Sequence, residues 1–173
     1  MKIACFASAS PHSLKYREDV LALGRKLGEK GHTLVFGGYA DGLMKAIADG
    51  FHQSNAKIIG VVPDFFEDTH YHHVGCTSLI HVKTLAERKE IMIKEADAFL
   101  VLPGGVGTLD ELMSVLALKT SGRLVKPVYI YNCDGFYNTL IELLEDMNKQ
   151  GLIRSFDKLY KVVSNLEEVE SMI

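Results

Sequence analysis

Apolar positions along the chain follow two different spacings. Short, β-rich apolar runs predict strands, and segments whose apolar residues recur about every three or four positions predict helices. The predicted strands are Ile3–Ala7, Thr33–Phe36, Lys57–Val62, Leu79–Val82, Ala98–Leu102, Val128–Tyr131 and a short Lys161–Val163. The predicted helices are Leu14–Lys30, Leu43–Gln53, Ala86–Glu95, Thr108–Lys119, Phe136–Gln150 and Leu166–Met172. Because strands alternate with helices, we expect an α/β fold with a doubly wound parallel sheet of six to seven strands and helices on both faces.

Residues 64–78 follow neither spacing, and we expect an irregular loop there. Three histidines lie in this segment, namely His70, His72 and His73. No helix or strand fixes their geometry, so we expect solvated side chains and no metal site. No linker, repeat or low-complexity segment interrupts the pattern, and residues 1–173 are expected to form a single domain.

Composition narrows the classes of protein that fit this pattern. Hydrophobic residues make up 47% and charged residues 24%, which is typical of a globular chain. A net charge of −3 argues against non-specific binding to nucleic acid or to an anionic membrane. No apolar run approaches the roughly 20 residues that span a bilayer, and the N-terminus does not resemble a signal peptide. Cys5, Cys76 and Cys133 are widely spaced and odd in number, so we expect free thiols in a cytoplasmic protein.

A glycine-rich turn, Pro103-Gly104-Gly105-Val106-Gly107-Thr108, joins the apolar strand Ala98–Leu102 to a helix. Glycines let the backbone approach a ligand closely, and a helix N-terminus offers free N–H groups and the positive end of its dipole. This order predicts a phosphate site at the carboxyl end of a strand, where open α/β sheets bind ligands. The alternative is a structural turn without a ligand. The chain lacks the Gly-Lys-Ser/Thr of a P-loop, and no Gly-x-Gly-x-x-Gly follows its first strand.

Glu111 admits two interpretations. The sequence Thr108-Leu109-Asp110-Glu111 matches a capping box, in which threonine caps the helix and glutamate reaches back to the cap N–H. However, Asp110 and Glu111 place two carboxylates beside a predicted anion site. That arrangement is costly unless they serve a purpose other than phosphate binding, so a catalytic role for Glu111 stays open beside the capping role.

Basic and small polar residues follow other predicted strands. Arg88 and Lys89 open a helix, where cations oppose the helix dipole unless an anionic partner offsets their placement. Ser8 follows the first strand, and the segment 37–44, which contains three glycines, joins the second strand to a helix. Loops that converge on one sheet edge make a nucleotide-sized cleft plausible. The alternative for the charged run is an ordinary solvated helix face.

These motifs together resemble the LOG ("Lonely guy") family of cytokinin riboside 5′-monophosphate phosphoribohydrolases. The resemblance spans nearly the whole chain, and its two core motifs, Arg-Lys and Pro-Gly-Gly-x-Gly-Thr-x-x-Glu, are specific in combination. The segments that carry it are 36–44, 59–63, 87–89, 96–99, 103–111, 126–128 and 132–137.

The resemblance implies a Rossmann-like fold and a homodimer. It implies hydrolysis of the N-glycosidic bond of AMP or N6-substituted AMP to free base and ribose 5-phosphate, with Arg88 and Glu111 as catalytic residues. By analogy with glycosidases, Glu111 would stabilise an oxocarbenium-like state or position water, and no metal or cofactor is required. The residues expected to bind substrate or its phosphate are Ser8, Gly38, Leu85, Lys89, Pro103, Gly104, Gly105, Val106, Gly107 and Thr108.

Alternative functions remain. The first is a non-catalytic nucleotide or molybdenum-cofactor carrier, against which the pairing of Arg88 with Glu111 argues. DNA processing by a related Rossmann-like domain is disfavoured by the acidic net charge. Members of this family have also been called lysine decarboxylases, but no lysine here is a convincing pyridoxal-phosphate ligand. The chain departs from the family pattern in segment 112–122, which leaves the preferred base open.

Overall fold

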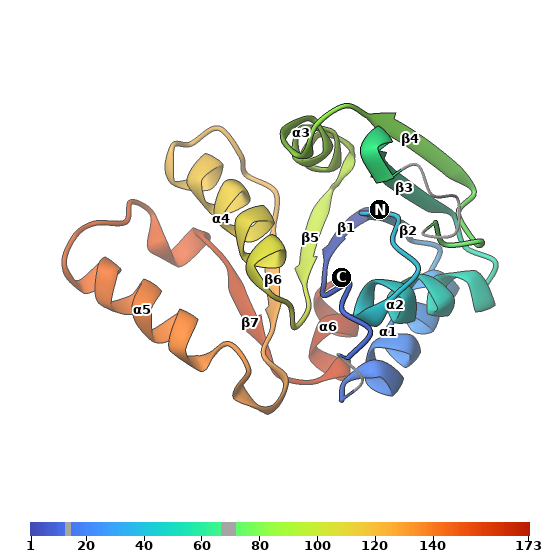
Figure 1. Cartoon of the computed structure of the whole chain (residues 1–173). Coiled ribbons are helices and arrows are strands. Elements are labelled where there is room, and N and C mark those ends of the chain that lie inside the picture. Colours follow the sequence, from blue (N-terminus) through green and yellow to red (C-terminus); the bar gives the residue numbers. More distant parts are fainter. Residues whose placement is uncertain (13–14, 67–71) are drawn as a thin grey trace.

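The computed structural model describes residues 1–12, 15–66 and 72–173. Seven parallel strands form one sheet in the order β4-β3-β2-β1-β5-β6-β7 (Figure 1). The strands are β1 (Lys2–Phe6), β2 (Thr33–Phe36), β3 (Ile58–Pro63), β4 (Ser78–Val82), β5 (Ala98–Val101), β6 (Val128–Tyr131) and β7 (Lys161–Val163). The helices are α1 (Arg17–Glu29), α2 (Gly42–Gln53), α3 (Leu85–Glu95), α4 (Val106–Thr120), α5 (Asn138–Lys149) and α6 (Leu166–Met172).

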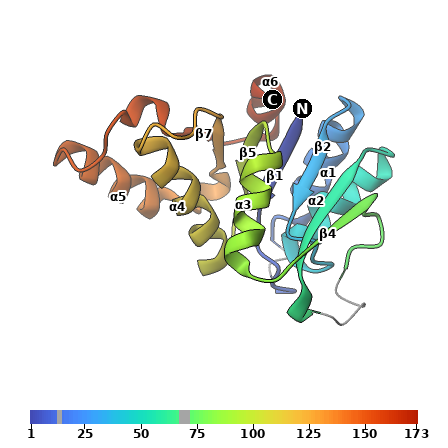
Figure 2. The same cartoon turned by 90° about the horizontal axis from the view of Figure 1, so that it is seen from above.

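Helices cover both faces of the sheet, as the strand–helix alternation predicts. α1, α2 and α6 lie on one face, and α3, α4 and α5 lie on the other (Figures 1 and 2). Successive residues of a strand point to opposite faces, so β1 contributes Ile3 and Cys5 to one core and Ala4 and Phe6 to the other. The doubly wound, Rossmann-like α/β fold is therefore confirmed.

The strand order reverses beside β1. The chain leaves β1 toward β2 on one side and later returns to place β5 on the other, where Phe6 pairs with Val101. The loops that follow β1 and β5 therefore diverge, and their divergence opens a crevice at the carboxyl edge of the sheet. The glycine-rich turn follows β5, so the topology places it at this crevice.

Several element boundaries differ from the expectation. α4 begins at Val106, two residues before the expected Thr108, and its N-cap is Gly105. α1 begins at Arg17, and the expected start at residue 14 lies outside the described residues. The segment 64–78, expected to be irregular, contains a one-turn 3-10 helix at Asp64–Phe66.

The expectation of solvated histidines is wrong for His73, which is 3% exposed. Its Nε2 lies 2.8 Å from Asp49 Oδ1, and the Gly75 N–H donates to its Nδ1 at 3.0 Å. The acceptor role of Nδ1 places the ring proton on Nε2, which donates to the carboxylate. His70 lies outside the described residues. Within the described residues, no group of three or more His, Cys, Asp or Glu side chains forms a potential metal site.

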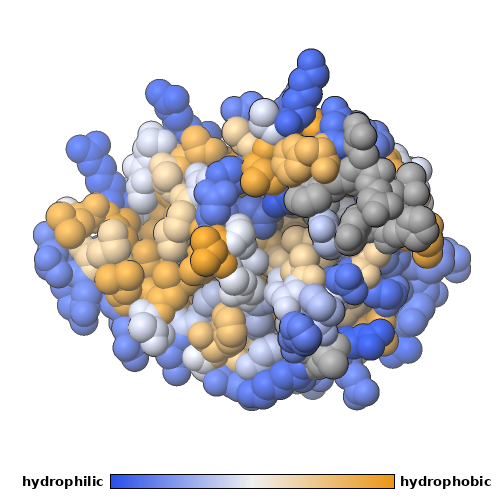
Figure 3. Space-filling model, viewed as in Figure 1, coloured by the Kyte–Doolittle hydropathy of each residue, from blue (hydrophilic) through white to orange (hydrophobic). Residues whose placement is uncertain are grey.

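Apolar side chains also reach the surface. Figure 3 shows them gathered over the α4–α5 part of the molecule, and the exposed apolar residues include Val125, Leu143 and Leu152. None of the helices in the described part of the chain is long and apolar enough to cross a membrane.

Candidate active site

A cavity of about 490 Å³ lies at the carboxyl edge of the sheet, where the loops after β1 and β5 diverge. The loop after β1, the loop after β2, the start of α3 and the start of α4 supply its walls. Its lining residues are Ala7, Ser8, Ala9, Tyr39, Met44, Leu85, Arg88, Gly105, Gly107, Thr108 and Glu111.

The glycine-rich turn packs tightly against the helix that follows it. A Cβ on Gly104 would collide with the Thr108 side chain, so only glycine lets the chain turn into α4 this closely. The Ser8 N–H donates to the Pro103 carbonyl at 3.2 Å, which ties the loop after β1 to the turn. Gly105, Gly107 and Thr108 line the cavity, and the first N–H groups of a helix have no intrahelical acceptor. This wall is therefore suited to an anion.

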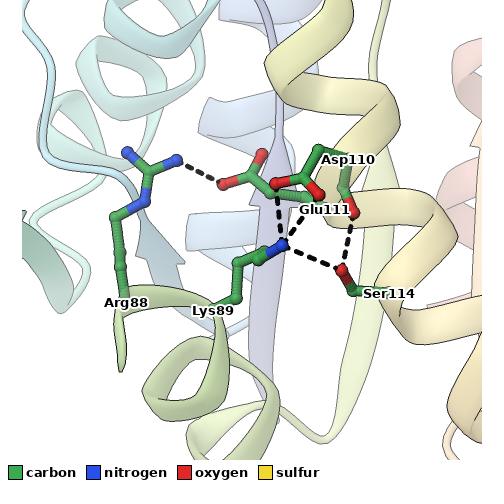
Figure 4. A network of polar contacts seen from close by, with 5 residues as sticks. All are labelled: Arg88, Lys89, Asp110, Glu111 and Ser114. Carbon is green, nitrogen blue, oxygen red and sulfur yellow. Dashed lines mark hydrogen bonds and ion pairs between the residues drawn. The ribbon is translucent and has the colours of Figure 1, made fainter. Parts of the chain in front are cut away.

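Glu111 is paired with Arg88, and both residues line the cavity (Figure 4). Arg88 Nη2 donates to Glu111 Oε1 at 2.8 Å, and the two side chains are only 13% and 2% exposed. The Arg88 Nε is buried and has no hydrogen-bond partner within the described part of the chain. The site therefore combines a buried carboxylate with a guanidinium whose buried Nε has no hydrogen-bond partner in the described residues.

The capping role considered for Glu111 is wrong. Gly105 is the N-cap of α4 and makes no side-chain cap hydrogen bond, while the Glu111 carboxylate binds Arg88 instead. A side-chain cap related to a capping box lies one helix earlier, where Thr84 is the N-cap of α3 and Glu87 reaches back to the residue before Thr84. There Thr84 accepts from the Glu87 N–H at 3.1 Å, and Glu87 accepts from the Lys83 N–H at 2.8 Å. The position of Glu111 therefore needs another explanation than helix capping.

The protonation of Glu111 is set mainly by its burial. Burial raises its pKa from 4.5 to about 7, and the negative charge of Asp110 acts in the same direction. The charges of Arg88 and Lys89 lower this pKa but do not offset the burial. A carboxyl group with a pKa near neutrality can both accept and donate a proton, and such groups cluster at active sites.

Lys89 lies beside this pair but does not line the cavity. Its Nζ is 2.8 Å from both carboxylate oxygens of Asp110 and 3.1 Å from Ser114 Oγ. Its predicted contact with a phosphate therefore finds no support in this arrangement and stays a prediction.

The other expected site residues fall into three groups. Ser8, Leu85, Gly105, Gly107 and Thr108 line the cavity together with the predicted catalytic pair. Pro103 and Gly104 line a smaller neighbouring cavity of about 230 Å³. Gly38 and Val106 line neither of these two cavities, and Val106 is 84% exposed.

Four lining residues were not singled out from the sequence, namely Ala7, Ala9, Tyr39 and Met44, although Tyr39 and Met44 belong to the segment 37–44 expected at this sheet edge. Three of them immediately follow β1 or β2, the strands that end at the crevice. The rule that ligands bind at the carboxyl ends of strands would have found these three, whereas Met44 lies within α2.

The fold and the site together define a class of protein. It is a Rossmann-like α/β protein with a cavity at the switch point of the sheet, between a helix N-terminus and a buried arginine–glutamate pair. A family model described as "possible lysine decarboxylase" matches residues 44–173.

Two relatives place the chain more narrowly. The cytokinin riboside 5′-monophosphate phosphoribohydrolase LOG2 of Arabidopsis thaliana is 33% identical over 148 residues, which cover 86% of this chain and 70% of that protein. LOG7 of the same organism is 32% identical over 171 residues, which cover 94% of this chain and 79% of that protein. The chain therefore belongs to the LOG family.

A solved structure shares the fold at lower sequence identity. The molybdenum cofactor binding protein of the phototrophic bacterium Rippkaea orientalis is 20% identical, with a TM-score of 0.76 over 99% of this chain and 93% of that one. At this identity the likeness concerns the fold alone.

Proposed function

We propose that this protein hydrolyses the N-glycosidic bond of adenosine-type nucleoside 5′-monophosphates, N6-substituted ones included, and releases free base and ribose 5-phosphate. The observation that carries the proposal is the Arg88–Glu111 pair, which is buried in the cavity beside the N-terminus of α4. The names of the relatives, both phosphoribohydrolases, support the same reaction.

The phosphate of the substrate binds at the first turn of α4. The free N–H groups around Gly107 and Thr108 and the positive end of the helix dipole favour a dianion there. The Arg88 guanidinium, which lines the same cavity, adds a positive charge. These contacts hold the ribose between the helix end and Glu111.

Glu111 acts on the ribosyl carbon. As the C1′–N bond breaks, its electron pair leaves with the base and C1′ gains oxocarbenium character. The Glu111 carboxylate stabilises this positive charge and accepts a proton from the water that attacks C1′. Because its pKa is about 7, Glu111 then returns the proton to the departing base near neutral pH.

Amino-acid decarboxylation fits this cavity less well, although the family model carries that description. Pyridoxal phosphate forms a Schiff base with a lysine. No lysine is among the described residues that line the cavity, and the nearby Lys89 is bound to Asp110.

Incubation with AMP and with N6-substituted AMP tests the proposal. We expect free base and ribose 5-phosphate in equal amounts, detected by chromatography. Glu111→Gln should lower kcat by at least about a hundredfold while nucleotide binding, measured by calorimetry, is largely kept. Glu95→Gln is the matched control, because Glu95 pairs with Lys2 and does not line the cavity, and it should behave as wild type.

The outcomes separate the two candidate roles. AMP that binds without release of base from any monophosphate would favour the carrier role and overturn the hydrolase. The homodimer implied by the resemblance is a separate prediction, and light scattering of the purified protein measures it directly.

A further inference from the structure

Two ion pairs join α3 to α4 side by side. Consecutive residues of α3, Arg88 and Lys89, meet consecutive residues of α4, Glu111 and Asp110 (Figure 4). The inner pair, Arg88–Glu111, lines the cavity, and Lys89–Asp110 is the outer pair. The outer pair lies on the other side of the same helices, where Lys89 lines a second, shallow cavity between α3 and α4.

All three N–H donors of the Lys89 ammonium group have an acceptor in this arrangement. A lysine ammonium carries three N–H donors. Three acceptors surround it, the two carboxylate oxygens of Asp110 at 2.8 Å and Ser114 Oγ at 3.1 Å. Ser114 in turn donates to the Asp110 carbonyl at 2.7 Å, so its oxygen is oriented to accept. Binding a phosphate would require Lys89 to give up these bonds.

We propose that Lys89 is a positioning residue that acts through Asp110, and that it is not a ligand of the substrate phosphate. The Lys89–Asp110–Ser114 bridge holds α3 against α4, so that Arg88 stays opposite Glu111. The kinetic part of this inference rests on the proposed hydrolysis, whereas its structural part does not.

The bridge acts at the N-terminal half of α3, whereas the other polar anchors of this helix, the Lys2–Glu95 pair and the Lys126 Nζ bonds to the Ile93 and Lys94 carbonyls, lie at its C-terminal end. Met92 is the one buried residue of this helix, whose residues are all described. The bridge is shielded on its Lys89 side only, since the Lys89 side chain is 21% exposed and that of Asp110 is 57% exposed. A partly buried charged hydrogen bond is stronger than a solvated one, and it contributes more to orientation.

The bridge also balances the charge around Glu111. Asp110 raises the pKa of Glu111, and Lys89 lowers it. While both are present, their opposing effects partly cancel. Loss of Lys89 should therefore move the pKa of Glu111 upward, and loss of Asp110 should move it downward.

Charge-removing and charge-reversing variants test the bridge. Lys89→Met and Asp110→Asn should each lower kcat by about tenfold with little change in KM, because neither residue touches the substrate. The double variant K89D/D110K rebuilds the pair in reverse and should recover most of the lost kcat. Lys89→Arg keeps the charge and the bridge and should stay near wild type. An ion pair that does not involve α3 provides the matched control, and Lys149→Met, which removes the exposed pair with Asp146 in α5, should change neither constant.

A phosphate ligand would behave differently. If Lys89 binds phosphate, Lys89→Met raises KM strongly, Asp110→Asn leaves or improves affinity, and the reversed pair fails to recover activity. That pattern would overturn the inference. Circular dichroism of each variant separates these effects from loss of folding.

A readout without turnover keeps this test independent of the proposed reaction. Carbon-13 NMR titration of the glutamate carboxyl groups follows Glu111 directly, with Glu111→Gln identifying its signal. Opposite shifts of its pKa in Lys89→Met and Asp110→Asn would support the bridge even if no monophosphate is hydrolysed. Unchanged titration in both variants would overturn it.

Discussion

At the scale of single residues, Glu111 decides how the site responds to pH. The ordinary carboxyl pKa of 4.5 applies in the unfolded chain, and burial raises it to about 7 in the folded one. The folded state therefore binds this proton more tightly. The resulting stabilisation is fully present below about pH 4.5 and is lost as the pH rises through about 7.

This linkage predicts a measurable change in stability. The contribution is on the order of 3 kcal/mol, because each pKa unit corresponds to about 1.4 kcal/mol. Denaturant unfolding of wild type should give a free energy of unfolding that falls between about pH 5 and about pH 8. The free energy of unfolding of the Glu111→Gln variant should fall less over the same range. Equal pH dependence in the two proteins would show that Glu111 has an ordinary pKa.

At the scale of elements, the start of α5 is hydrogen-bonded to the backbone just before the glycine-rich turn. The Tyr137 hydroxyl donates to the Leu102 carbonyl at 2.7 Å, and the Tyr137 N–H donates to Asn132 Oδ1 at 2.7 Å. Tyr137 is 3% exposed, so this bond is shielded from water. A residue far along the chain thus fixes the backbone that leads into the glycine-rich turn.

Tyr137→Phe removes this support without changing the shape of the core. We expect a loss of about 1–3 kcal/mol in stability, because the Leu102 carbonyl loses a buried donor, and a weaker affinity for AMP. Thermal melting and calorimetric titration measure the two effects. Tyr129→Phe is the control, since the Tyr129 hydroxyl donates to the Met172 carbonyl in α6 and its loss should lower stability alone. Equal affinity losses in both variants would argue against a specific role.

At the scale of the whole molecule, the sheet protects its central strand. Cys5 lies in β1 between β2 and β5 and is 1% exposed. Burial also raises the pKa of its thiol, which lowers the thiolate fraction that reacts. The expectation of free cysteines is confirmed, because Cys5, Cys76 and Cys133 form no disulfide.

Thiol labelling should therefore report global unfolding. Cys5 should react with iodoacetamide only as fast as the whole domain opens, whereas the half-buried Cys76 should react sooner. Mass spectrometry of digested protein distinguishes the sites over a denaturant series. Fast labelling of Cys5 without denaturant would mean that β1 opens locally.

The sequence by itself determined the order of strands and helices along the chain and the location of the glycine-rich turn. Strands such as Ala98–Val101 can be recognised in the sequence because buried parallel strands need apolar residues on both faces. The turn can be recognised from its glycines because close backbone packing excludes a Cβ. The same local reasoning placed the start of α4 two residues late, since Val106 and Gly107 carry no start signal of their own.

Only the tertiary structure decided which charged groups are partners. Glu111 fits a capping box within its own helix, yet it binds Arg88, a residue 23 positions away, because α3 and α4 lie side by side on one sheet face. His73 likewise contacts Asp49, 24 positions away, because the loop that carries His73 packs against α2. Charge pairing across elements depends on the packing of helices, and no local sequence pattern specifies it.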